Sequence, residues 1–222
     1  MTVEAVESAN GQRGLVLVQK ILDWGVDGLG PLKSAEDVAR EHLAQHRDVE
    51  VAIDRLIRTH ARTVTATGFA TGFGGFAAMG VMLPADITAF YAQAARCAAA
   101  VAHLRGYDIH SEEVRSIILL TLLGSAGVGV AAEFGVKLGT KASMAALKKL
   151  PGKALTAINQ RVGFRLVTKF GSKGLINLGR AVPFVGAGVG AGINAVGMRS
   201  IGTYAKSNFP AGDVVVESPT VE

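Results

Sequence analysis

The sequence predicts an all-α, compact, single-domain protein with Gly/Ala-rich central helices and a basic amphipathic C-terminal half. Apolar residues recur at helical spacing, helix-capping residues precede several of these segments, and strand-like residues are confined to positions 214–216. The chain has 222 residues, of which 49% are hydrophobic and 18% are charged. A charged fraction below the roughly 25% of ordinary soluble domains indicates heavy burial or contact with a membrane.

Capping residues divide the first half into helices. Residues 15–26 are apolar at helical spacing, and Ser34 is the expected N-cap of a polar helix that follows. Asp48 is the expected cap of a longer helix. Pro84 is expected to begin a further helix that runs to Leu104, because proline is favoured in a first helical turn. Ser111 then caps the next helix.

In the second half, the spacing of apolar residues predicts an uncharged helix core over Ser116–Ala132. It also predicts two basic helices over Val136–Leu150 and Lys153–Phe170. A last uncharged run, Ala181–Met198, precedes Arg199. We expect an N-terminal segment with one helix, a helical domain and a flexible tail, over residues 1–33, 34–209 and 210–222.

Charge is distributed very unevenly along the chain. From Phe134 to Gly212 there are twelve Lys and Arg residues and no Asp or Glu, whereas eleven basic and fifteen acidic residues come before Phe134. A segment with one sign of charge leaves its charges in water, borrows carboxylates from the first half, or meets an anionic partner. Glu133 stands alone in an apolar run and, if buried, needs a partner, for which Lys137 is the simplest choice.

The segment Lys153–Phe170 carries an apolar stripe flanked by basic residues. This pattern is typical of a helix that lies in a membrane interface, and it also fits an ordinary amphipathic helix of a protein core. The absence of acidic residues favours the interfacial interpretation, since each Lys or Arg near anionic lipid contributes about 1 kcal/mol. The stripe is Leu155, Ile158, Val162, Leu166 and Phe170, and the predicted membrane- or anion-binding residues are Lys148, Lys149, Lys153, Arg161, Arg165, Lys169 and Lys173.

Three uncharged runs raise the question of membrane spanning. Thr63–Ala85 is long enough but holds four Thr and five Gly, and Ser116–Ala132 and Ala181–Met198 are short. Buried central helices are therefore favoured over spanning helices. Small residues four apart allow helices to approach closely, and the predicted packing glycines are Gly68, Gly72, Gly74, Gly75, Gly186, Gly188, Gly190 and Gly192.

Chemical signatures are weak. His42 and His46 are four residues apart, but the run REHLAQH is not the HExxH zinc motif, so no metal and no cofactor are predicted. The single cysteine, Cys97, cannot form an internal disulfide, which fits a reducing cytosol. A pI near 9.5 suits nucleic acid, yet no helix-turn-helix, zinc ligand set or aromatic platform accompanies it, so nucleic acid is disfavoured.

Two blocks resemble a known family. The first runs from His60 to Asp108 and includes TGFATGFGG and LPADITAFYAQAARCAAAVAHLRGYD; the second reads VPFVGAGVGAGIN and IGTYAKSNF. Together they resemble the EcsC family of bacterial proteins, whose namesake belongs to an operon that encodes an ABC transporter. The resemblance implies a helical domain and supplies no catalytic residues. The family-pattern polar residues, expected to form a buried cluster, are His60, Asp86, Gln93, Arg96 and Asp108.

These observations predict a non-enzymatic cytoplasmic protein, peripheral to the inner face of the cell membrane, that supports a transporter or secretion process. Its expected partners are anionic phospholipid and a transporter or other membrane protein. Two alternatives remain open: an integral membrane protein packed through glycines, and a hydrolase that uses Asp86, Asp108 or the histidines.

Overall fold

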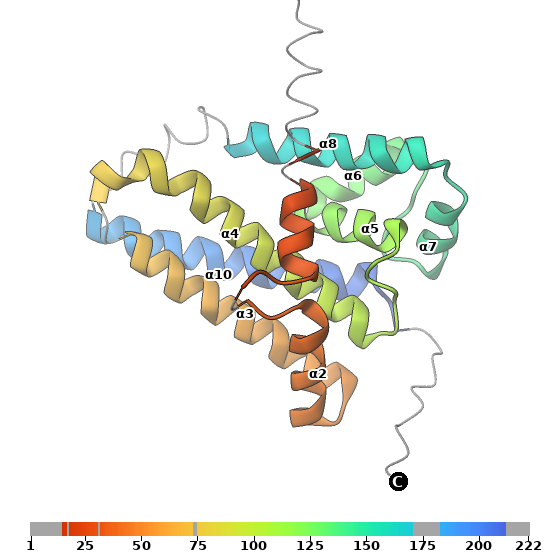
Figure 1. The fold of residues 1–222 in the computed structure, drawn as a ribbon, viewed down its shortest axis with the longest axis horizontal. Coiled ribbons are helices and arrows are strands. Elements are labelled where there is room, and N and C mark those ends of the chain that lie inside the picture. The colour runs from red at the N-terminus through yellow and green to blue at the C-terminus, as the bar shows by residue number, and fades with distance from the viewer. Residues whose placement is uncertain (1–14, 17, 31, 73–74, 171–182, 212–222) are drawn as a thin grey trace, which may run out of the picture.

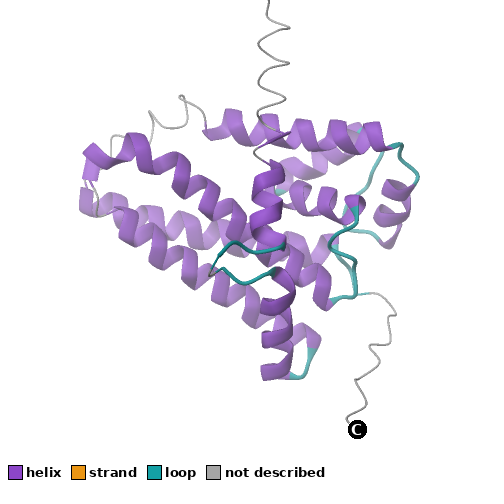
Figure 2. Cartoon of the chain, in the orientation of Figure 1, coloured by secondary structure: helices purple, strands orange, loops and turns teal. Residues whose placement is uncertain are grey.

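The computed structural model describes residues 15–16, 18–30, 32–72, 75–170 and 183–211. These residues are almost entirely helical and contain no strand, which confirms the predicted all-α fold (Figure 2). An N-terminal helix covers residues 18–26. It is followed by α2 (Ala35–His46), α3 (Val49–Gly72), α4 (Gly75–Leu104), α5 (Glu112–Leu122), α6 (Ser125–Glu133), α7 (Lys141–Lys148), α8 (Gly152–Phe170) and α10 (Pro183–Asn208).

The three longest helices, α3, α4 and α10, pack side by side, and α2 packs across α3 and α4 (Figure 1). α5 connects this bundle to the rest of the molecule, because it contacts α4 and α10 on one side and α6, α7 and α8 on the other. α7 and the start of α8 lie at the end of the molecule opposite the start of α10 (Figure 1).

The core centres on α5 and on the second half of α4. Every residue from Ser116 to Leu122 is buried, as expected for a helix that is apolar around most of its circumference. On α4, small side chains fill the interior between Tyr91 and Leu104, and Cys97 is fully buried among them. Burial raises the pKa of the Cys97 thiol to about 12, so this thiol is protonated and unreactive at neutral pH.

The predicted helix caps are present. The Ser34 hydroxyl accepts the Asp37 N–H (3.1 Å), and the Asp48 carboxylate accepts the Val51 N–H (2.8 Å). The Ser111 hydroxyl accepts the Val114 N–H (3.4 Å). Each cap satisfies one of the backbone donors that the first turn of a helix leaves unpaired.

Three expected helix boundaries are wrong. α4 begins at Gly75, so Pro84 lies inside the helix; a proline there removes one intrahelical hydrogen bond without ending the helix. The uncharged Ser116–Ala132 run forms two helices, because Gly124 adopts a φ of 60° between α5 and α6. The first basic helix is shortened to α7, and a loop with two glycines at positive φ precedes it: Gly135 and Gly139.

One close helix contact uses a glycine that was not predicted, and one predicted packing glycine makes no such contact. A Cβ on Gly202 of α10 would lie 2.6 Å from the Ile57 side chain of α3, whereas Gly192 is exposed and a Cβ there would meet nothing within 4 Å. Gly74 lies outside the described residues. For six further predicted packing glycines on α3, α4 and α10, the neighbouring side chains lie outside the described residues: Gly68, Gly72, Gly75, Gly186, Gly188 and Gly190.

The end of α10 is tied to the start of α3 and the end of α4. The buried guanidinium of Arg105 pairs with Glu50 (2.6 Å) and donates to the Lys206 carbonyl (2.7 Å). The Tyr107 hydroxyl donates to the Pro210 carbonyl (2.9 Å). These bonds hold the three long helices in register at one end. Within the described residues, no helix has an apolar stretch long enough to cross a bilayer.

Candidate functional site

Several basic residues of the second half form ion pairs with carboxylates of the first half. Lys206 of α10 donates to Asp54 (2.8 Å) and pairs with Glu50 (3.2 Å), and these hydrogen bonds raise the pKa of Lys206. Arg161 and Arg165 of α8 both pair with Glu133, at 3.2 and 3.1 Å. Glu133 is therefore exposed and held by two arginines, in place of the predicted partner Lys137.

The apolar stripe of α8 faces the protein core. Leu155, Ile158, Val162 and Leu166 are all at most 5% exposed, and α8 packs against α5 and α6. Because this face is already covered by protein, α8 is an ordinary amphipathic core helix and does not present its stripe to a membrane interface. The side chain of Phe170, the last residue of the stripe, lies outside the described residues.

The predicted lysines at the junction of α7 and α8 are accessible. Lys148, Lys149 and Lys153 are exposed, and none forms an ion pair within the described part of the chain. Lys169 lies on α8 with its side chain outside the described residues, and Lys173 lies outside them altogether. The basic set predicted from the sequence therefore divides into a free lysine corner (Lys148, Lys149, Lys153) and two arginines that share Glu133.

A second group of exposed cations lies on α3 and α10. Because Lys206 contacts Asp54 and Gly202 packs against Ile57, the two helices run antiparallel, and one further turn brings Arg199 to the level of Arg62. Arg58, one turn from Arg62, is also exposed. No ion pair within the described residues involves Arg58, Arg62 or Arg199, which we call the arginine girdle.

The sequence contains a signal for this girdle that the pattern of any single helix does not reveal. Arg62 immediately precedes the uncharged run Thr63–Ala85, and Arg199 immediately follows the uncharged run Ala181–Met198. Each arginine is therefore the charged residue directly next to an uncharged helix segment. Their common level becomes evident only from the antiparallel packing of α3 and α10.

The family-pattern polar residues come together only in part. Arg96 of α4 is 4% exposed; its Nη1 donates to Gln93 (3.3 Å) and its Nη2 donates to the Trp24 carbonyl (3.2 Å). Trp24 lies near the end of the N-terminal helix, so the guanidinium meets a carbonyl at the negative end of a helix dipole. The Arg96 Nε is buried and has no hydrogen-bond partner within the described residues.

Close packing brings Arg96 and the N-terminal helix together. A Cβ on Gly25 would lie 2.7 Å from the Ala95 Cβ and 2.9 Å from the Arg96 backbone nitrogen, so only glycine fits at this crossing. Burial lowers the pKa of Arg96, although an arginine stays protonated at neutral pH. Since its described contacts are the Gln93 amide and a backbone carbonyl, we assign Arg96 a structural role at this helix crossing.

The remaining polar candidates lie elsewhere. Asp108 is exposed and accepts the His110 N–H (3.0 Å) in the turn before α5, so it does not join Arg96. Asp86 lies on α4, with its side chain outside the described residues. His42 contacts the Val38 carbonyl of its own helix (2.8 Å), and no group of side chains suited to a metal occurs in the described residues.

His60 is buried on α3, and its Nδ1 donates to the Leu56 carbonyl (3.0 Å). Burial, with the positive charge of Arg96 nearby, lowers the pKa of His60 from 6.5 to about 4. The imidazole is therefore neutral at pH 7. In the unfolded chain it takes up a proton near pH 6.5, whereas the folded protein resists this proton until about pH 4.

We expect the free energy of unfolding to fall by about 3 kcal/mol between pH 7 and pH 4 through His60 alone. Replacing His60 with Leu, which fills the site with an apolar group of similar size and removes the titration, is expected to remove this part of the pH dependence. Urea unfolding of both proteins at pH 7.5 and pH 4 measures the difference. Equal losses of stability in the two proteins would contradict the assignment.

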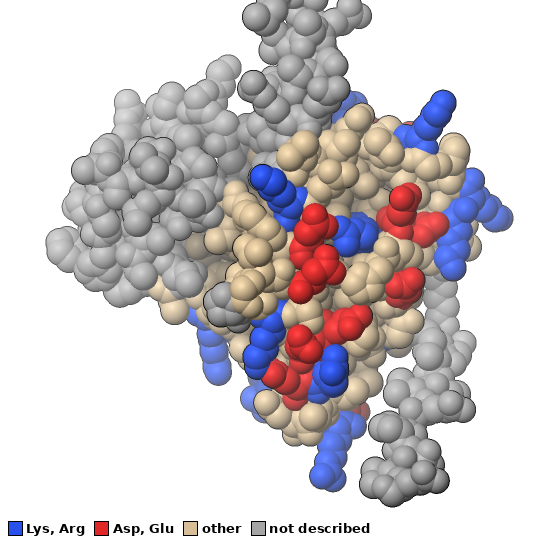
Figure 3. Space-filling view, viewed as in Figure 1, with Lys and Arg blue, Asp and Glu red and all other residues tan. Residues whose placement is uncertain are grey.

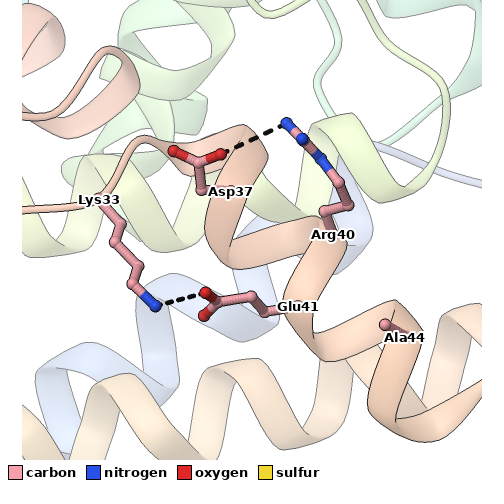
Figure 4. Close-up of a pocket in the computed structure, with 5 residues that line it drawn as sticks. All are labelled: Lys33, Asp37, Arg40, Glu41 and Ala44. Carbon is pink, nitrogen blue, oxygen red and sulfur yellow. Dashed lines mark hydrogen bonds and ion pairs between the residues drawn. The ribbon is translucent and has the colours of Figure 1, made fainter.

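A shallow surface pocket on α2 is lined by charged residues that pair with one another (Figure 4). Lys33 pairs with Glu41, and Arg40 pairs with Asp37 at 3.4 Å. Asp37 also accepts the Ser34 hydroxyl, and this hydrogen bond lowers the pKa of its carboxyl group. These charges neutralise each other at the surface, and the pocket offers no nucleophile with an adjacent base.

Comparison with known families decides the relationship. The model of the EcsC protein family matches residues 19–210. The chain belongs to the EcsC protein family. The match begins in the N-terminal helix, about forty residues before the block that starts at His60, so it includes Trp24 and Gly25, which contact Arg96. No curated protein and no solved structure matches this EcsC-family chain.

Proposed function

We propose that this EcsC-family chain is a non-enzymatic, peripheral membrane protein that binds anionic phospholipid headgroups. It acts at the inner face of the cell membrane, in support of a transporter or secretion process. The observation that carries the proposal is the arginine girdle: Arg58, Arg62 and Arg199 are exposed, lie within about one helical turn of one another along the bundle, and have no carboxylate partner within the described residues. Exposed cations of this kind attract an anionic surface.

The distribution of acidic side chains supports an oriented contact. Figure 3 shows acidic residues gathered over the middle of the visible face, across the N-terminal helix, α2 and α5. Asp23 belongs to the N-terminal helix and Glu36 to α2, and Asp27 directly follows the N-terminal helix. Several of these acids are paired with basic residues, as Asp23 is with Arg115, so this face offers anionic headgroups little net positive charge, whereas the girdle attracts them. Electrostatics therefore favours one orientation of the molecule on the membrane.

The membrane contact proposed here uses the arginine girdle, in place of the basic helix α8 that was expected from the sequence. The apolar face of α8 is used inside the protein, and Arg161 and Arg165 are partly neutralised by Glu133. The free lysine corner remains a candidate for headgroup contact, but the described residues around it include few exposed large apolar side chains. The girdle is favoured because it borders the exposed apolar residues Ile193 and Val196.

Sedimentation of the purified protein with vesicles tests the proposal. We expect binding to vesicles that contain an anionic lipid such as phosphatidylserine to exceed binding to neutral phosphatidylcholine vesicles at low salt. The difference is expected to shrink between about 0.05 and 0.5 M salt, as the Debye length falls toward the size of an ion pair. Equal binding to both kinds of vesicle, or binding to neither, would contradict electrostatic attachment.

A further inference from the structure

One end of the bundle is nearly free of charge on three helices at once. Residues 63–72 of α3 and 183–198 of α10 carry no charged residue, and residues 75–89 of α4 carry only Asp86. Figure 1 shows these three helix segments together at the left of the view, at the end farthest from α7. We call them the uncharged end. The arginine girdle lies at its base, because Arg62 immediately precedes the uncharged part of α3 and Arg199 immediately follows the uncharged part of α10.

The described side chains at this end include apolar groups that face solvent. Val196 is 67% exposed and Ile193 is 56% exposed, which makes them the most exposed large apolar side chains of the described residues. They line a shallow hollow on α10 together with Gly192, Gly197 and Ser200. Removing such side chains from water is favourable by roughly 25 cal/mol for each Å² of apolar surface.

We propose that the uncharged end enters one leaflet of an anionic bilayer, while the arginine girdle stays at the level of the headgroups. This inference rests on the membrane attachment proposed above and names the part of the chain that enters the lipid. Measured from the girdle, the uncharged parts of α3 and α10 extend about 15 and 24 Å, at 1.5 Å per residue. The hydrocarbon core is about 30 Å thick, so the α3 segment matches the depth of one leaflet, and the α10 segment is too short to span both.

The sequence of the uncharged end fits this environment. Phe69 of α3, Phe76 of α4 and Phe184 of α10 all fall within it. Aromatic and aliphatic side chains on one side of a boundary and arginines on the other are the composition of segments that bind at the bilayer surface. The arginines also have long aliphatic stems that reach between headgroups while the charge remains in water.

Charge complementarity favours lipid over a second copy of the chain at this end. A second copy that met this end would offer the girdle no negative charge, and two copies packed in parallel along their uncharged ends would place their girdles side by side, where like charges are unfavourable. An anionic bilayer instead offers an apolar interior bordered by negative charge. This order of layers matches the uncharged end followed by Arg58, Arg62 and Arg199.

A fluorescent label that reports polarity tests the inference. Ile193→Cys is labelled with the dye NBD, and Thr156→Cys, at an exposed position of α8, is the matched control. The native Cys97 is fully buried, which protects it from labelling. We expect the label at position 193 to shift to the blue and brighten several-fold with phosphatidylserine vesicles, and to be quenched by lipids spin-labelled on the acyl chain. The label at position 156 is expected to stay unchanged.

Each outcome separates this inference from the proposal on which it rests. Protein that sediments with anionic vesicles while the label at position 193 stays aqueous would overturn insertion of the uncharged end and leave membrane attachment intact. Protein that sediments with no vesicle would overturn both. A blue shift without lipid that grows with protein concentration would identify a second copy as the occupant, and would also overturn the inference.

Discussion

Changing Arg58, Arg62 and Arg199 together to Glu is expected to weaken binding to anionic vesicles at least about 100-fold at low salt. Each basic residue near an anionic surface contributes about 1 kcal/mol, and 1.4 kcal/mol corresponds to a factor of ten in affinity. Losing three attractions therefore accounts for about 100-fold, and the three new repulsions add to it. Vesicle sedimentation over a range of lipid concentrations measures the change in affinity.

The lysine corner provides a matched control for this prediction. Changing Lys148, Lys149 and Lys153 together to Glu alters the net charge by the same amount, at the end of the molecule opposite the uncharged end (Figure 1). We expect this variant to keep most of the binding. Equal losses in the two triple variants would show that net charge, and not the girdle, determines attachment. Far-ultraviolet circular dichroism checks that both variants remain folded.

Gly127→Ala is expected to lower the free energy of unfolding by roughly 3 kcal/mol. A Cβ at this position would lie 2.0 Å from the Leu120 carbonyl oxygen, which belongs to the backbone of α5 and cannot rotate away. The added methyl group must therefore force apart the turn that joins α5 and α6. Because α5 is buried along almost its whole length, its displacement disturbs the core of the molecule.

Gly129→Ala, two residues further along α6, is the matched control. A Cβ there would meet nothing within 4 Å, and the residue is exposed within a helix. Alanine is a better helix former than glycine, so we expect this variant to be more stable than the wild type by about 0.5–1 kcal/mol. Urea unfolding of both variants tests the contrast, which would be refuted by Gly127→Ala showing wild-type stability.

The sequence predicted those parts of the fold that depend on local chemistry. The all-α class, the caps at Ser34, Asp48 and Ser111 and the start of α2 follow from spacing and capping, which act within a few residues. The start of α4 and the break at Gly124 were missed because tertiary packing decides them. Pro84 is tolerated inside a helix, and a glycine within an apolar run ends one.

The site was harder to predict for the same reason. The stripe Leu155–Leu166 looks alike whether it packs against lipid or against α5, and only the fold shows that protein covers it. Likewise, Arg62 and Arg199 are far apart in the sequence and become neighbours only because α3 and α10 run antiparallel. Gln93 and Arg96 meet in the structure because they lie one turn apart on one helix, a proximity that spacing alone can indicate.

The most direct test of the central claim is hydrogen–deuterium exchange of the full chain with and without anionic vesicles. If the uncharged end and the arginine girdle contact the membrane, amide exchange slows over residues 63–72, 75–89 and 183–198. The amides of α2 and α7 then exchange as they do without vesicles. Slowing confined to α7 and the start of α8, or no slowing in vesicle-bound protein, would contradict the account.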